Sequence, residues 1–231
     1  MLKLSIIIPV FNEKGTIGKV IENINDTKID LSKEIIVVDD CSIDGTKEIL
    51  RKINNNSVKI FFHQKNMGKG AAIRTGLKNS TGDILLIQDA DLEYDPKEYQ
   101  KLLKPIIEKK AEVVYGSRLG AIEKNIKNMN KLHYIGNLFL TFATNILYGA
   151  KITDMETGYK VFKKEVIKNL NLRARRFDFE PEITAKILKN GFKIHEVQIG
   201  FAARKFKEGK KITWVDGLKA LFYLIKYRFV D

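Results

Sequence analysis

The sequence predicts an α/β fold in which a mostly parallel sheet carries helices on both of its faces. Short apolar runs rich in β-branched residues alternate with helical patterns, and the connections between them are short. The strand-like runs are residues 4–10, 34–40, 58–64, 83–89 and 111–117. The helical patterns lie near residues 15–26, 44–54, 69–79 and 97–109. On such sheets, ligands bind at the carboxyl ends of the strands.

Polar residues follow the first four strand-like runs. These ends read PVFNE, DDCS, HQKN and QDAD, so their side chains are expected to converge on one crevice. Carboxylates at the second end, from Asp39 and Asp40, can accept hydrogen bonds from a nucleoside base or ribose. Asp44 is expected to cap the helix that follows.

The segment ILLIQDADLEYDP, residues 84–96, places an acid at every second position from Asp89 to Asp95. In an extended chain, side chains two residues apart point the same way, so Asp89 and Asp91 can face one cation. Crowded carboxylates repel, and a hard divalent ion would neutralise them while leaving room for substrate phosphates. An acidic solvated turn is the alternative interpretation, since D-x-D is a common tripeptide.

The glycine-rich segment NMGKGAAIRTG follows the third strand-like run. It lacks the spacing of a P-loop, and the first run is not followed by G-x-G-x-x-G, which argues against a nicotinamide-binding fold. Gly68 and Gly70 would let the backbone approach a ligand, with Lys69 as a nearby charge. A helix start that uses glycine is the alternative.

Composition predicts a soluble globular protein, with 44% hydrophobic and 30% charged residues, and we expect one domain over residues 1–231. The sequence begins with a strand-like run and not with a signal-peptide pattern, so a cytoplasmic location is expected. The single cysteine, Cys41, agrees with a reducing compartment.

The net charge of +13 is unevenly distributed. Residues 1–96 hold 13 basic and 14 acidic residues, whereas residues 97–231 hold 28 and 14. This asymmetry indicates a nucleic acid, an anionic membrane or a phosphorylated substrate as partner, or else a solvated lysine-rich surface. Nucleic-acid binding is not expected, because no recognition motif or aromatic stacking platform accompanies the basic residues.

Two apolar helices are expected in the second part. Residues 134–150 carry no charge, but the run is slightly short for a membrane span and has a polar stripe at helical spacing, which favours a core or interfacial helix. The C-terminal helix, residues 215–229, mixes apolar and basic residues. It is expected either to lie in a membrane interface or to pack on the protein's own core.

The set and order of these motifs resemble the inverting family-two glycosyltransferases, which have the GT-A (nucleotide-diphospho-sugar transferase) fold. The resemblance rests on SIIIPVFNE, EIIVVDDCSIDGT, NMGKGAAIRTG, QDADLEYDP and GSR. The later ITDMETGYKVF, FDFEPEITAKI and RKFKEGKKITWVDG narrow it to members similar to dolichyl-phosphate mannose synthase and its polyprenyl-phosphate relatives. The match covers nearly the whole chain.

The resemblance implies a role for individual residues. Residues 1–96 would form mainly the donor and metal site, and residues 97–231 mainly the acceptor side. Arg118 and His133 would contact the acceptor, and Asp89, Asp91 and Arg118 would be catalytic. Mg²⁺ or Mn²⁺ would be held by Asp89, Asp91 and Glu93, although several relatives have Gln at the last position. The donor-binding residues would be Pro9, Phe11, Asn12, Glu13, Asp39, Asp40, Lys69, Asp89, Ala90, Asp91, Arg204 and Lys210.

The implied reaction is metal-dependent inverting transfer of a hexose to a polyprenyl (dolichyl) phosphate at the cytoplasmic face of a membrane. GDP-mannose is the donor favoured by the resemblance, and UDP-glucose or another UDP-sugar is the alternative. A phosphate acceptor is already anionic near neutral pH and needs no general base. A soluble or glycan hydroxyl acceptor would need one, and Asp154, Glu156 and Glu180 are the candidates. Peripheral membrane contact is expected, directly or through a membrane partner protein.

One further departure from the family pattern and one segment also concern the site. Cys41 stands where the family commonly has Gly, and a small side chain is expected to fit that turn. The segment EGKKITW resembles a mobile flap in which Lys210 and Lys211 would close over the donor diphosphate and exclude water.

Overall fold

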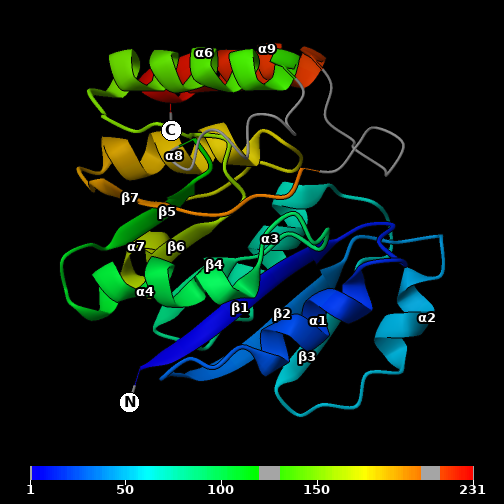
Figure 1. Cartoon of the computed structure of the whole chain (residues 1–231). Helices are drawn as coiled ribbons and strands as arrows, with labels where there is room; N and C mark the ends of the chain where they lie inside the picture. The colour runs from blue at the N-terminus through cyan, green and yellow to red at the C-terminus, as the bar shows by residue number, and fades with distance from the viewer. Residues whose placement is uncertain (1, 120–130, 204–213, 231) are drawn as a thin grey trace.

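The computed structural model describes residues 2–119, 131–203 and 214–230, and its centre is a seven-stranded sheet (Figure 1). Strand β1 pairs in parallel with β2 and β4, and β2 pairs in parallel with β3. Strand β6 is antiparallel to both β4 and β5, while β7 is parallel to β5. The strand order is β3-β2-β1-β4-β6-β5-β7. The bounds are β1 Lys3–Val10, β2 Ser32–Asp39, β3 Val58–Phe62, β4 Ile84–Ile87, β5 Val113–Ser117, β6 Lys160–Lys163 and β7 Ile194–Gln198.

Helices cover both faces of the sheet, which confirms the predicted α/β architecture. Buried side chains of α1, α2 and α4 belong to the core on one face, and those of α3, α7 and α8 to the core on the other. The bounds are α1 Ile17–Asp26, α2 Thr46–Arg51, α3 Lys69–Lys78, α4 Tyr99–Ile107, α6 Lys131–Tyr148, α7 Lys164–Lys168, α8 Phe179–Lys189 and α9 Trp214–Phe229. The antiparallel strand β6 was not predicted.

Strand β1 is central because it is apolar on both sides of the sheet. Ile6, Ile7 and Ile8 are fully buried, and alternate residues of the strand face the two helical layers. The strands that neighbour it on both sides are equally apolar, as in other doubly covered parallel sheets. Parallel pairing then places the carboxyl ends of β1, β2 and β4 along one edge.

Helices α6 and α9 form a further layer next to α8 (Figure 1). Leu140, Met155 and Leu224 make a small core between these helices and the rest of the protein, and the Tyr148 hydroxyl donates to the Leu224 carbonyl over 2.6 Å. No described helix has the length and apolarity needed to cross a membrane. Ala220 and Leu224 of α9 belong to the same small core, so the C-terminal helix packs on the rest of the protein through one of its sides.

The other sides of α6 and α9 leave large apolar side chains in solvent. Phe142 and Phe222 are each 62% exposed, and Phe229 is 79% exposed. We call this surface the α6–α9 face: Ile135, Leu138, Phe139, Phe142 and Ile146 of α6, with Leu218, Phe222, Ile225 and Phe229 of α9. Such surfaces on a monomer mark interaction sites with proteins or membranes.

Left-handed turns follow the first two strands. Asn12 has φ +54° and Cys41 has φ +64°, a region in which a residue with a Cβ is strained and glycine is not. This backbone conformation explains why a glycine is common at the position of Cys41. The two turns redirect the chain at the strand ends and shape the crevice there.

Candidate active site

The carboxyl ends of β1, β2 and β4 open into a cavity of about 420 Å³, here called the strand-end cavity. Most of the predicted site residues line it, although they come from distant parts of the sequence. They are Pro9, Phe11, Glu13, Asp40, Lys69, Asp89, Ala90, Asp91, Glu93 and Arg118. Asn12, Asp39 and His133 do not line it, and Arg204 and Lys210 lie outside the described residues. The Lys211 prediction also falls outside them.

The Asp40 carboxylate organises the loop that leads into α3. It accepts hydrogen bonds from the backbone N–H groups of Met67 (2.9 Å) and Gly68 (2.6 Å), and its Oδ1 lies 2.7 Å from Nδ1 of His63. The other His63 nitrogen lies 2.9 Å from the Thr75 hydroxyl. The carboxylate is thus engaged inside the protein and fixes the position of the loop beside Lys69.

Gly68 and Gly70 are needed for a close approach between two segments of the chain. A Cβ at Gly68 would lie 2.3 Å from the Arg175 carbonyl oxygen, and one at Gly70 would lie 2.8 Å from the Ala174 carbonyl oxygen. Gly68 also has φ +98°. The sequence predicted that these glycines admit a ligand, whereas the backbone they admit is that of the segment before α8.

Asp39 and Asn12 hold the turns behind the cavity wall. Asp39 is fully buried, and one of its oxygens accepts from the Ser42 backbone N–H over 3.1 Å. Asn12 accepts from the Ile43 backbone N–H over 2.9 Å, and its own N–H donates to the Ser42 hydroxyl. Within the described residues, Oδ1 of Asp39 is buried without a hydrogen-bond partner.

The acidic segment contributes three carboxylates to the cavity. Asp91 accepts from the Glu93 backbone N–H over 3.1 Å, and Asp89 lies 2.8 Å from the Lys69 ammonium. Among the described residues, no three His, Cys, Asp or Glu side chains are grouped closely enough to hold a metal ion by themselves. Mg²⁺ commonly takes only one or two carboxylates and completes its shell with water and substrate phosphates. Asp89 and Asp91 fit that mode of binding.

Alternating charges extend inward from Asp89. Lys69 also lies 3.3 Å from Glu180, and Glu180 forms an ion pair with the fully buried Lys160. Burial disfavours the charged form of Lys69, but the two carboxylates outweigh it and raise the pKa of the ammonium. A glycine is required at position 158, beside this row of charged side chains, because a Cβ there would lie 2.3 Å from Oδ2 of Asp89.

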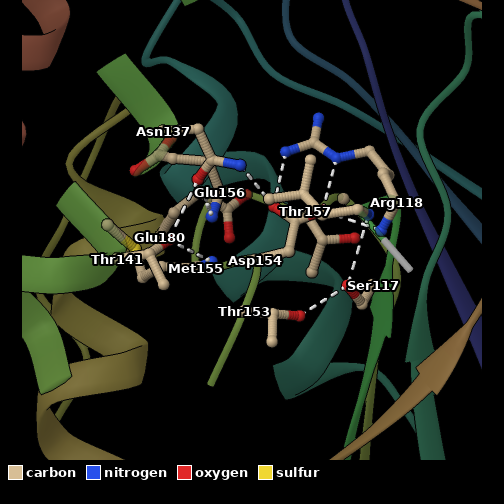
Figure 2. A network of polar contacts seen from close by, with 12 residues as sticks. Ser117, Arg118, Asn137, Thr141, Thr153, Asp154, Met155, Glu156, Thr157 and Glu180 are labelled. Atoms are coloured by element: carbon tan, nitrogen blue, oxygen red, sulfur yellow. Dashed lines mark hydrogen bonds and ion pairs between the residues drawn. The ribbon is translucent and has the colours of Figure 1, made fainter. Parts of the chain in front are cut away.

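A second network holds Arg118 (Figure 2). Its guanidinium donates to both oxygens of the buried Asp154 over 2.7 Å, and its backbone N–H donates to the same carboxylate over 2.9 Å. The Asn137 amide adds a hydrogen bond of 2.7 Å from α6. Burial opposes the charge of Asp154, but Arg118 outweighs it and lowers the pKa of the carboxyl. The network fixes the orientation of Arg118 at the cavity wall.

Glu156 is a carboxyl of the cavity wall with a raised pKa. Burial, and next the negative charge of Glu180, raise its pKa to about 7. Its backbone N–H donates to Asn137, while its Oε1 is buried without a hydrogen-bond partner in the part of the chain that the structure describes. The network of Figure 2 therefore contains one carboxyl that titrates near neutrality, next to an arginine that does not.

Asn66, from the strand end HQKN, lines the cavity as expected, but sequence reasoning missed other residues of its wall. Tyr94, Arg176 and Phe177 line it, and the Tyr94 hydroxyl accepts from the Gly158 backbone N–H over 2.8 Å. The basic run RARR, residues 173–176, was the available signal for Arg176. Nothing in the local pattern indicated that this run returns to the glycine-rich loop.

Comparisons with known proteins identify the family of the chain. The family model described as Glycosyl transferase family 2 matches residues 5–170. The chain is 33% identical to the UDP-N-acetylglucosamine–dolichyl-phosphate N-acetylglucosaminyltransferase of Methanococcus voltae, over 95% of this chain and 94% of that protein. It is 28% identical to the dolichol-phosphate mannosyltransferase of Pyrococcus furiosus, over 98% of this chain and 64% of that protein.

Solved structures show the same fold. Glucosyl-3-phosphoglycerate synthase from Mycobacterium tuberculosis, in complex with Mn²⁺, UDP and phosphoglyceric acid, superposes with a TM-score of 0.73 at 19% identity. The similarity covers 100% of this chain and 80% of that one. The predicted GT-A architecture is therefore confirmed.

Proposed function

The chain belongs to glycosyl transferase family 2 and is a glycosyltransferase, and we propose that it transfers a hexose from a nucleotide sugar to a polyprenyl phosphate. The observation that carries this proposal is the lining of the strand-end cavity. Its wall contains the carboxylates Asp89 and Asp91 together with the cations Lys69 and Arg118. Carboxylates and cations in one cavity match a metal-bound diphosphate on the donor and a phosphate on the acceptor.

On the donor side, Asp89 and Asp91 would hold Mg²⁺ or Mn²⁺. The metal would stabilise the negative charge that develops on the departing nucleoside diphosphate. Lys69 already neutralises Asp89, so it would shift toward donor phosphate oxygens when the ion binds. Phe11 and Glu13 line the same cavity and would contact the nucleoside. GDP-mannose and UDP-sugars are both candidate donors: the Methanococcus voltae relative is named for a UDP-sugar, and the Pyrococcus furiosus relative for transfer of mannose.

On the acceptor side, Arg118 would orient the phosphate that attacks the anomeric carbon. Its bidentate pair with Asp154 keeps the guanidinium plane fixed, so less side-chain freedom is lost when the acceptor binds. The acceptor oxygen is anionic, because a phosphate monoester has a second pKa of about 6. No side chain then has to remove a proton from it.

A lipid acceptor requires access to a membrane. The α6–α9 face exposes aromatic and aliphatic side chains from two adjacent helices, of which α9 also carries Lys219, Lys226 and Arg228. We propose peripheral attachment through this face at the cytoplasmic side of a membrane, with or without a membrane partner protein.

Transfer to a hydroxyl acceptor is the second candidate function, and Glu156 is the observation that favours it. A carboxyl with a pKa of about 7 is suited to act as a general base near neutral pH. In that reaction Glu156 would take the acceptor proton as its oxygen attacks. Substituting the base would cost about 10²- to 10⁴-fold in rate.

A transfer assay distinguishes the two functions. Purified protein would receive Mn²⁺, radiolabelled GDP-mannose or a UDP-sugar, and either a short polyprenyl phosphate or the corresponding free polyprenol. We expect label in the organic phase with the phosphate acceptor and with one donor, also for Glu156→Gln. Label on the free alcohol alone, lost in Glu156→Gln, would replace the proposal with hydroxyl transfer.

A further inference from the structure

A second and larger concavity lies beside the strand-end cavity. It has a volume of about 1190 Å³ and runs between α3, the segment before α8, and α9. Asn66, Arg176 and Phe177 line both spaces, so the two adjoin. We call it the basic groove because of the side chains that line it: Lys65, Arg74, Lys78, Arg173, Arg175, Arg176, Lys219 and Lys226.

Most of the charge of the basic groove has no acidic counterpart in its wall. Asp178 is the one acidic residue among the described residues that line it. The described ion pairs include none from the side chains of Lys65, Lys78, Arg175 or Lys219, and these four residues are exposed. Cations held close together on one concave surface attract a ligand with several negative charges.

Helix α9 joins the basic groove to the α6–α9 face. Its residues 219, 223 and 226, and Val230 directly after it, line the groove, while residues 218, 222, 225 and 229, one position earlier in each case, are exposed and apolar. Tyr223 and Tyr227 also line the groove, and the Lys226 ammonium lies over both rings. An apolar stripe beside a basic, tyrosine-bearing stripe is the pattern of a helix in a lipid–water interface.

We propose that the basic groove binds the phosphate groups of anionic phospholipids while the α6–α9 face lies in the acyl boundary of the same leaflet. Arginine forks match phosphate oxygens, and the lysines add point charges. The mouth of the strand-end cavity would then lie next to the headgroup layer, where the phosphate of a lipid acceptor is located. Only the statement about the lipid acceptor rests on the proposed function. Binding of the groove to vesicles does not depend on that function.

Vesicle co-sedimentation tests the inference with the full chain. Vesicles of phosphatidylcholine would be compared with vesicles that also contain phosphatidylglycerol, both free of polyprenyl phosphate. The variant Arg175→Gln/Lys219→Gln removes two groove charges that lie outside the strand-end cavity. Each basic residue near an anionic surface contributes about 1 kcal/mol, so we expect binding to anionic vesicles to weaken about 30-fold. The matched control, Lys52→Gln/Lys109→Gln, removes two exposed charges at the ends of α2 and α4.

Three outcomes would overturn the inference. The first is equal binding of the native chain to both kinds of vesicle, and the second is an equal loss in the groove variant and the control. The third is competition by inorganic phosphate at constant ionic strength, which would make the groove a site for a soluble anion. Transfer to a short acceptor in detergent is expected to be the same in the groove variant and the native chain. Vesicle binding without any transfer would therefore contradict the proposed function and leave the groove as a lipid site.

Discussion

The strand-end cavity and the basic groove adjoin each other, yet they treat charge in opposite ways. In the cavity, acids and bases alternate: Asp89 pairs with Lys69, and Lys69 also pairs with Glu180. In the groove, cations such as Arg175 and Lys219 are exposed and make no described ion pair. Paired, half-buried charges suit a small charged ligand, which can replace one partner of an existing ion pair. Unpaired, exposed charges suit a large anionic surface that supplies the missing partner.

This contrast predicts that substitutions in the cavity change the rate of transfer, whereas substitutions in the groove change binding to the membrane. The largest effect is expected for Asp91→Asn, which removes a carboxylate that we propose to bind the metal, without changing the size of the side chain. Losing metal stabilisation of the leaving diphosphate should lower kcat/KM about a thousand-fold, or about 4 kcal/mol. Initial rates with Mn²⁺ and radiolabelled donor measure it.

Asp95→Asn is the control for Asp91→Asn. Asp95 comes from the same acidic segment, but its carboxylate caps a short 3₁₀ helix by accepting from the Lys97 backbone N–H over 3.0 Å. An amide oxygen can keep that hydrogen bond. Similar rate losses in both variants would show that the charge of the whole segment matters and that Asp91 has no special role.

The next effect concerns the buried pair of Arg118 and Asp154. Asp154→Asn leaves a guanidinium buried without its counter-charge, which typically costs about 3 to 5 kcal/mol. Urea unfolding of the variant and the native chain measures the loss. Glu22→Gln serves as the control, because Glu22 pairs with Lys19 at a fully exposed site on α1 where such pairs contribute little. Equal losses in the two variants would refute a special role for the buried network.

A smaller, pH-dependent effect is expected from Glu156. Its pKa is about 7 in the folded protein and 4.5 in the ordinary, unfolded setting, so between these values the folded protein holds a proton that the unfolded chain has released. Stability should therefore fall as pH rises from about 4.5 to about 7, by at most about 3 kcal/mol from this group. Lys160 and Arg118 limit the shift, while Glu180 and Asp154 increase it.

Glu156→Gln should flatten this dependence and make the protein more stable near pH 7. Urea unfolding at a series of pH values compares it with Glu196→Gln. The carboxylate of Glu196 accepts from the backbone N–H groups of Thr153 and Asp154, so its substitution should be destabilising. A Glu156→Gln curve parallel to that of the native chain would show that Glu156 is ionised in the folded state.

The local sequence pattern was sufficient to predict most of the site residues that line the strand-end cavity. Parallel strands end along one edge, so residues that follow β1, β2 and β4 within one or two positions were expected near the cavity, and Phe11, Asp40 and Asp89 line it. Gln88, directly after β4, is an exception because it is buried and accepts from the Tyr99 and Tyr159 hydroxyls. The prediction was less accurate for residues one position away: Asp39 is the last residue of β2, and its side chain is buried away from the cavity wall. Alternation along a strand decides this, and the register was not known beforehand.

The basic groove could not be predicted from the local sequence pattern. The excess of basic residues after residue 96 was visible, but the groove depends on three segments that meet only in the fold: the loop before α3, the RARR run, and α9. The contact between the first two segments requires Gly68 and Gly70, which looked like ligand-binding glycines in the sequence. The antiparallel β6, which brings Lys160 and Gly158 beside Asp89, was missed for the same reason.

The smallest predicted effect separates the apolar and electrostatic parts of membrane attachment. Phe142→Ser/Phe222→Ser removes two exposed rings from the α6–α9 face, one from each helix. Each is 62% exposed, so folding stability should change by less than about 0.5 kcal/mol. Binding to vesicles should weaken about tenfold or more, because each ring would otherwise leave water in the interface.

The salt dependence of that loss distinguishes the two surfaces. Burial of a phenyl ring is hardly screened by ions, so the loss in Phe142→Ser/Phe222→Ser should be the same for neutral and anionic vesicles and persist at high salt. The loss in Arg175→Gln/Lys219→Gln should disappear there, since screening removes the attraction that the variant lacks. Ile43→Ser is the control, because Ile43 is 86% exposed on the turn after β2, away from α6 and α9. If it weakened binding as much as the phenylalanine variant, apolar exposure in general, and not this face, would hold the protein to lipid.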